Sequence, residues 1–107
     1  MLKWLQEWFC QLCDGEWEHE NSLVIETIDN PGWSIEIDLN NINLNIQSKE
    51  WQIYELSEDN WIGYKIDENI YFATGDPLKL EKLIIVFKEI IENEKIDDSF
   101  VFSLLES

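Results

Sequence analysis

The stretch that decides the fold is residues 14–39, DGEWEHENSLVIETIDNPGWSIEIDL. After an acidic turn it holds two runs with strand character, residues 23–28 and 33–39, separated by a Pro-Gly turn. In the second run apolar and polar side chains alternate, so one face of the strand is apolar and the other carries Glu36 and Asp38. The stretch therefore predicts two neighbouring strands in a sheet with one buried and one acidic face.

The turn between these strands, Asn30-Pro31-Gly32-Trp33, is typical of a type II turn. Pro31 fixes φ at the first central position, and Gly32 accepts the positive φ that the second position requires. We therefore expect Pro31, Gly32 and Trp33 to be structural residues.

Residues 2–12 have apolar side chains at helical spacing and predict an amphipathic helix with Trp8 on its apolar face. Asp14-Gly15 ends this helix, since Gly15 suits a left-handed cap. Further strands are predicted at residues 42–47, 51–56, 61–66 and 70–73.

A second long helix is predicted from Asp76 onwards, with Asp76 as N-cap and Pro77 at the first helical position. Its apolar stripe runs along Leu80, Leu83, Ile84, Phe87, Ile90 and Ile91. Residues 97–105 could form either a short last helix or a strand.

Together these elements predict an α+β fold in which residues 1–107 form one domain. Short strands with close turns imply an antiparallel meander of about five to six strands. The N-terminal and C-terminal helices are expected to pack on one face of this sheet. The other face, which carries Glu36 and Asp38, is then either simply solvated or a docking surface.

The charge of the chain is lopsided, with 23 Asp and Glu against seven Lys and Arg and a net charge of −16. Such a surface repels nucleic acid and anionic membranes, so we expect neither as a partner. It attracts basic partners, although the charge also fits a protein that is merely soluble. The N-terminal segment lacks the features of a signal peptide and no long apolar run follows, so a cytoplasmic location is expected.

The sequence shows no phosphate-binding glycine loop, zinc-protease motif or serine elbow, so we expect neither an enzyme nor a cofactor. Cys10 and Cys13 form a C-x-x-C pair, and His19 is the single histidine. Because no further Cys or His can complete a zinc site, we expect buried structural thiols and no metal. A small metal-binding protein or enzyme that uses these three residues is the alternative from another class, and a cytosolic adaptor is a further one.

The aromatic residues are expected to be mostly structural. Trp8, Trp33 and Trp51 lie on predicted apolar faces and are assigned to the core. Trp17 and Trp61 each flank an acidic turn. Burial is favoured for both side chains, and the alternative is that they are exposed anchors for a partner. His19, close to Trp17, is expected to be a packed structural residue.

Three motifs carry a resemblance to a known family: WLQEWF at residues 4–9, CDGEWEH at 13–19 and TIDNPGW at 27–33. They resemble the immunity protein 53 family, small bacterial proteins encoded beside polymorphic toxins. A looser similarity covers residues 61–87 and includes Phe72 and Gly75-Asp76-Pro77. Among the departures, Phe9 stands where the family usually has Tyr.

The resemblance implies a protein that binds and neutralises a cognate toxin domain, without catalytic residues of its own. Many such toxins are nucleases with basic substrate grooves, which an acidic protein would complement. We expect the toxin to be basic and to be contacted through the acidic turn, the polar face of the 33–39 strand and a second acidic loop. The residues assigned to this contact are Asp14, Glu16, Trp17, Glu18, Glu36, Asp38, Glu58 and Asp59.

Overall fold

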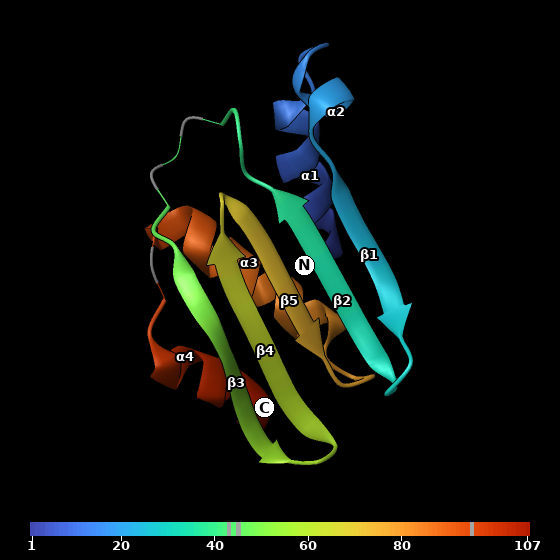
Figure 1. Ribbon diagram of the computed structural model, residues 1–107, viewed down its shortest axis with the longest axis vertical. Helices are drawn as coiled ribbons and strands as arrows, with labels where there is room; N and C mark the ends of the chain where they lie inside the picture. Colours follow the sequence, from blue (N-terminus) through green and yellow to red (C-terminus); the bar gives the residue numbers. More distant parts are fainter. Residues whose placement is uncertain (43, 45, 95) are drawn as a thin grey trace.

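Five antiparallel strands form one sheet, and the long helices lie together behind it (Figure 1). This computed structural model describes residues 1–42, 44, 46–94 and 96–107. The elements in chain order are α1 (Leu2–Leu12), α2 (Trp17–Glu20), β1 (Leu23–Ile28), β2 (Gly32–Asp38), β3 (Lys49–Ser57), β4 (Asn60–Asp67), β5 (Ile70–Gly75), α3 (Leu80–Asn93) and α4 (Asp98–Glu106). The predicted α+β fold is confirmed, and the open choice for the last segment is settled as a helix.

The strand order across the sheet is β1-β2-β5-β4-β3. β1 and β2 form a hairpin, and β3, β4 and β5 form a meander in which each strand pairs with the next. The two parts are joined by pairing of β2 with β5, so that β5 and β4 lie between β2 and β3 in the sheet. β5 is therefore the central strand although it is the last one in the sequence.

The strand predicted at residues 42–47 is wrong for the part that the structure describes, since residues 42, 44, 46 and 47 lie outside any strand. Positions 43 and 45 of that prediction lie outside the described residues. Ile42 and Ile46 are partly buried and pack against the core. Their alternating apolar pattern therefore reflects packing of a connecting segment and not strand pairing.

The core lies between the sheet and the helices. Ile35 and Tyr71 from neighbouring strands are fully buried, and Phe87 of α3 packs its ring 5.1 Å from the ring of Tyr71. Trp8 of α1 meets Phe87 edge to face at 4.9 Å, which confirms its predicted place in the core. Burial of each such large apolar side chain stabilises the fold by roughly 1.5–3 kcal/mol. The predicted amphipathic faces of α1 and α3 are thus used to cover one side of the sheet.

The turn between β1 and β2 differs from the predicted type II turn. The Asn30–Pro31 peptide bond is cis, and Gly32 does not have a positive φ. Glycine is needed at position 32 for another reason, because a Cβ there would overlap the carbonyl oxygen of Gly75 on β5. Gly15 has the expected positive φ, at +95°, but the prediction that it caps the first helix is wrong, because α1 ends at Leu12 with Cys13 as its C-cap in an extended conformation.

The start of α3 also differs from the prediction. The helix begins at Leu80, so Asp76 is not its N-cap and Pro77 precedes the helix in a turn. The side chain of Asp76 is buried instead, and its carboxylate accepts hydrogen bonds from the backbone N–H groups of Trp61 and Leu78. Asp76 therefore ties the β5–α3 connection to the start of β4.

Candidate partner-binding surface

One face of the sheet is not covered by helices, because α1, α3 and α4 all lie on the opposite side (Figure 1). Pairing aligns the side chains of this open face in rows across the strands. One row runs Val24, Glu36, Phe72 and Lys65, and the next runs Glu26, Ser34, Thr74, Gly63 and Ile53. The open face thus mixes carboxylates with apolar side chains that the core does not use.

Trp51 lies on this open face, and its predicted place in the core is wrong. Its side chain is 44% exposed, and its ring lies 6.2 Å from the ring of Phe72. The indole also lies against Gly63 of β4, where a Cβ would come within 2.6 Å of the Trp51 ring. Glycine in the middle of a strand often marks such a close approach. Here it lets the indole of β3 reach across β4 towards β5.

Sequence reasoning missed this residue because WQIYEL, at residues 51–56, has apolar side chains at both odd and even positions. Period-two alternation therefore does not assign a face. Irregular pairing between β3 and β4 on both sides of Ile53 blurs the pattern further. The one signal in the sequence was Gly63 within an otherwise bulky strand.

The two predicted contact residues on β2 have different roles. Glu36 is exposed on the open face, directly beside Phe72 in the strand register. Asp38 is half-buried, and its Oδ1 accepts hydrogen bonds from the backbone N–H and the side-chain amide of Asn40 at 2.9 and 2.8 Å. Glu36 is therefore free to contact a partner, whereas Asp38 shapes the end of the strand.

A hollow of about 260 Å³ opens on this face. It is lined by Glu36, Lys65, Asp67, Glu68, Ile70 and Phe72. The carboxylates outnumber the single lysine, and Phe72 forms an apolar wall. The geometry suits a cationic side chain with an apolar methylene chain or a planar charged group.

The acidic turn before β1 is largely occupied with its own structure. Glu18 accepts hydrogen bonds from the backbone N–H groups of Asp14 and Gly15, while Asp14 Oδ1 accepts those of Glu16 and Trp17. These backbone hydrogen bonds, first that of Trp17 and then that of Glu16, lower the pKa of Asp14. Both carboxylates thus stabilise the entry into α2.

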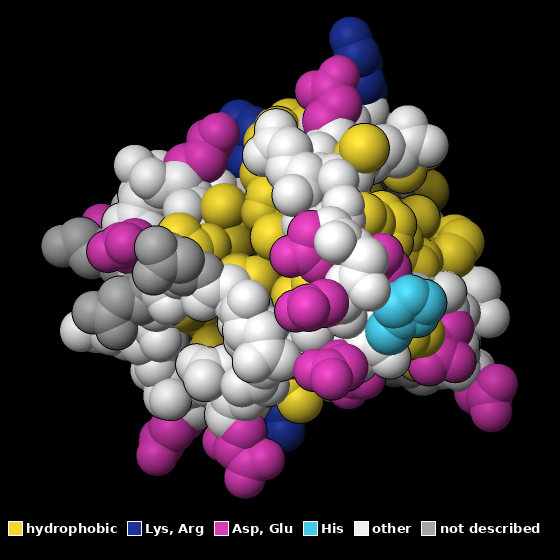
Figure 2. Space-filling view, turned by 90° about the horizontal axis from the view of Figure 1, so that it is seen from above, with side chains coloured by type: hydrophobic (Ala, Val, Ile, Leu, Met, Phe, Trp, Pro, Cys, Tyr) yellow, Lys and Arg dark blue, Asp and Glu magenta, His cyan; other side chains and the backbone are white. Residues whose placement is uncertain are grey.

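Trp17 is buried, so the alternative that it is an exposed anchor is wrong. Its indole N–H donates to the carbonyl oxygen of Asn40 at 3.2 Å, and its ring packs edge to face on Trp8. Glu16 in the same turn is exposed. Viewed from this end of the molecule, carboxylate groups surround the histidine side chain (Figure 2). The turn therefore adds negative potential at one end of the sheet.

The predicted contact residues do not form one continuous patch. The acidic turn beside α2 lies at one end of the long axis, and the β3–β4 turn with Glu58 and Asp59 lies at the other end (Figure 1). The molecule measures 43 Å along this axis. Glu36 lies on the open face between the two ends, with Phe72 beside it and Trp51 beyond Phe72, and the sequence prediction left out both aromatic residues.

Comparison with known proteins identifies the family of the chain. The sequence profile described as Immunity protein 53 matches residues 2–92. The chain belongs to the immunity protein 53 family. Searches of curated proteins and of solved structures found no match.

The cysteines of this immunity protein 53 family member are exposed, so the prediction of buried thiols is wrong. The pKa of Cys13 is raised, first by desolvation and then by the nearby carboxylate of Glu18, which disfavours a reactive thiolate. His19 is also exposed, so its predicted packed role is wrong. Within the described residues, no group of three or more His, Cys, Asp or Glu side chains is placed to hold a metal ion. The alternative of a metal site at Cys10, Cys13 and His19 therefore finds no support in the geometry.

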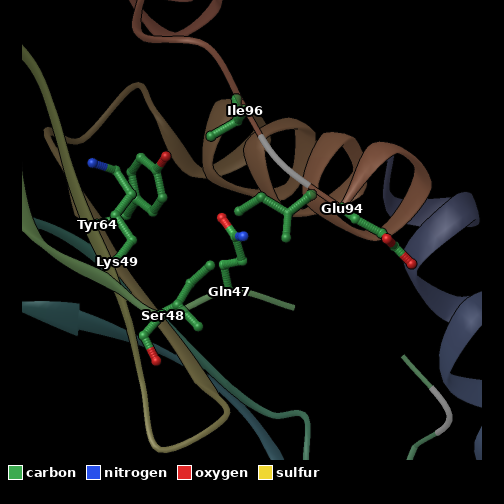
Figure 3. A pocket seen from close by; sticks show the side chains of 8 residues that line it. Gln47, Ser48, Lys49, Tyr64, Glu94 and Ile96 are labelled. Carbon is green, nitrogen blue, oxygen red and sulfur yellow. The ribbon is translucent and has the colours of Figure 1, made fainter. Parts of the chain in front are cut away.

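A smaller hollow of about 160 Å³ lies between β4, the segment before β3 and the end of α3 (Figure 3). The ammonium group of Lys49 lies at its edge, 5.2 Å from the centre of the Tyr64 ring. The buried hydroxyl of Tyr64 has no hydrogen-bond partner among the described residues, and burial raises its pKa to about 12. A neutral phenol with a raised pKa does not serve as a base near neutral pH.

In the part of the chain that the structure describes, no helix is long and apolar enough to cross a membrane.

Proposed function

We propose that this chain neutralises a cognate bacterial toxin by binding it as a stoichiometric protein inhibitor, without catalysing a reaction. Membership of the immunity protein 53 family supports a toxin as the partner. The observation that carries the proposal is the uncovered sheet face, where Trp51, Ile53 and Glu36 are exposed although the core does not need them. Exposed apolar side chains gathered with charges are a common sign of a protein contact.

The charge of the chain supports a basic toxin. A net charge of −16 accelerates the encounter with a cationic surface and disfavours nucleic acid and anionic membranes as partners. We assign direct contact to Glu36 on the open face. Glu16, Glu58 and Asp59 lie exposed towards the two ends and contribute to steering. A nuclease, whose substrate groove is basic, fits this description, and neutralisation takes place in the cytoplasm of the producing cell.

The test is co-expression with the toxin domain encoded beside the gene. Growth should be rescued, and the two purified proteins should form a one-to-one complex whose affinity falls as salt concentration rises. The charge reversal Glu36→Lys should weaken binding, while the matched reversal Glu106→Lys on α4, behind the sheet, should leave it close to that of the wild type. Failure of the wild-type protein to rescue growth or to bind the toxin would refute the proposal.

A further inference from the structure

The open face has an apolar centre that the fold itself does not require. Trp51 is 44% exposed and Ile53 is 52% exposed, and both lie beside Gly63, where a Cβ would collide with the indole. A larger residue at position 63 would have strengthened the strand and pushed Trp51 away. The chain instead keeps a flat indole on its surface next to Phe72. Large, rigid aromatic side chains of this kind are enriched among the residues that dominate binding energy.

The acidic hollow lies directly beside this apolar centre. Phe72 contacts Trp51 on one side and lines the hollow on the other. Three carboxylates and one ammonium group also line the hollow, those of Glu36, Asp67, Glu68 and Lys65. The volume of the hollow, about 260 Å³, accommodates the end of one long side chain. A guanidinium group fits such a place, because it stacks on aromatic rings and forms paired hydrogen bonds with carboxylates.

The rim of the hollow is held in place by the neighbouring backbone. Glu68 and Asn69 form the β4–β5 turn with positive φ values of 52° and 63°. The Asn40 amide donates to the carbonyl oxygen of Glu68, and the backbone N–H of Leu39 donates to that of Asn69 at 2.7 Å. Asp38 in turn holds Asn40. A surface arranged before binding loses less conformational entropy when the partner arrives.

We infer that the centre of the toxin contact is the Trp51–Phe72 pair with its adjoining acidic hollow, and that it receives an arginine-bearing segment of the basic toxin. An apolar side chain of that segment covers Trp51, and its guanidinium enters the hollow between Glu36 and Glu68. This inference rests on the proposed function. Charge complementarity selects a basic toxin over a second copy of the chain, since two such acidic faces repel each other.

The test measures affinity for the adjacent toxin domain with two variants of the open face. Trp51→Ala removes the anchor and should weaken binding at least about 30-fold. Glu68→Lys places an ammonium group in the hollow from an exposed turn and should weaken binding at least about tenfold. Leu78→Ala and Glu106→Lys are the matched controls, since Leu78 is 85% exposed in the turn before α3 and Glu106 is exposed on α4. Both controls should bind within about twofold of the wild type.

The outcomes separate this inference from the proposed function. If the wild-type protein binds the toxin and both open-face variants bind within twofold of the wild type, the inference is overturned but toxin neutralisation still stands. A wild-type protein that does not bind the toxin would remove both. Thermal unfolding of each variant checks that it is folded, and Glu68→Lys decides the matter if Trp51→Ala does not fold. A wild-type dimer that Trp51→Ala dissociates would show that a second copy occupies this face, which would also overturn the inference.

Discussion

Replacing Asp76 by asparagine should destabilise the protein strongly. The carboxylate is 1% exposed and accepts three hydrogen bonds of 2.9 Å, from the ammonium group of Lys79 and the backbone N–H groups of Trp61 and Leu78. Asparagine offers a single acceptor oxygen, so at least one buried donor loses its partner. It also leaves the Lys79 ammonium, on a residue only 8% exposed, without a counter-charge. Breaking a buried ion pair from one side costs about 3–5 kcal/mol, a large share of a typical domain's stability.

The pH dependence gives this prediction a second, independent signature. Burial alone would raise the pKa of Asp76, but the hydrogen bond from Lys79 and those from Trp61 and Leu78 outweigh it and lower the pKa below 3.8. A carboxylate whose pKa is lower in the folded state stabilises the fold above its unfolded-state pKa and loses that contribution as pH falls through the folded-state pKa. The difference in unfolding free energy between wild type and Asp76→Asn should therefore be largest near neutral pH and shrink below about pH 4.

Urea unfolding followed by tryptophan fluorescence, at several pH values, measures both effects. A loss of 3–5 kcal/mol corresponds to a drop in Tm on the order of 20 °C for a domain of this size. Asp59→Asn in the exposed β3–β4 turn is the control, because it also removes one negative charge and should change stability by no more than about 0.5 kcal/mol. An Asp76→Asn variant within 1 kcal/mol of the wild type, or a difference that does not change with pH, would refute this account of the buried pair.

Three further predictions concern the buried tyrosines and the β1–β2 turn. Tyr54→Phe should cost about 1–2 kcal/mol in urea unfolding, because the Tyr54 hydroxyl donates to Asp98 at 2.6 Å. Tyr64→Phe should be neutral or stabilising, because it removes a buried hydroxyl without a partner among the described residues. Equal losses of stability in the two variants would contradict this assignment. Burial is the largest cause that raises the pKa of Tyr54, Tyr64 and Tyr71. An alkaline absorbance titration should therefore show no tyrosinate in the folded state near pH 10, and the free energy of unfolding should fall as pH rises past the tyrosine pKa of about 10 in the unfolded state. Gly32→Ala should destabilise by about 1–3 kcal/mol in the same unfolding assay, since the new methyl group overlaps a backbone carbonyl of β5; a neutral variant would show that the strands yield easily.

Most of the secondary structure was predictable, because local rules determine it. The helix at residues 2–12 and the strand at residues 23–28 have the predicted bounds. Apolar side chains at helical spacing mark the helix, and a run rich in β-branched residues before the Pro-Gly turn marks the strand. The predictions that failed depended on tertiary contacts. Asp76 and Pro77 have the composition of a helix start, but the carboxylate serves a neighbouring strand instead. The segment at residues 42–47 alternates like a strand, but its described residues lie outside any strand, and Ile42 and Ile46 pack against the core instead.

The candidate site was only partly predictable for the same reason. Glu36 follows from alternation within one strand, so the sequence alone assigns it to the open face. The contact of Trp51 with Phe72 joins β3 to β5 across Gly63, and only the strand order reveals it. Likewise, nothing in the local sequence shows that Asp14 and Glu18 bind backbone N–H groups nearby. Composition therefore predicted an acidic surface, while the position of its aromatic centre required the fold.

The position of β5 in the middle of the sheet bears on how the molecule is made. During synthesis from the N-terminus, the β1–β2 hairpin leaves the ribosome long before Gly75, the last residue of its inner neighbour. Until then the inner edge of β2 has no partner, and Ile35 and Ile37 lack the side chains that will cover them. A nascent chain stopped short of β5 therefore cannot assemble the row that joins Glu36 to Phe72, and the proposed contact surface forms only after Gly75 has emerged.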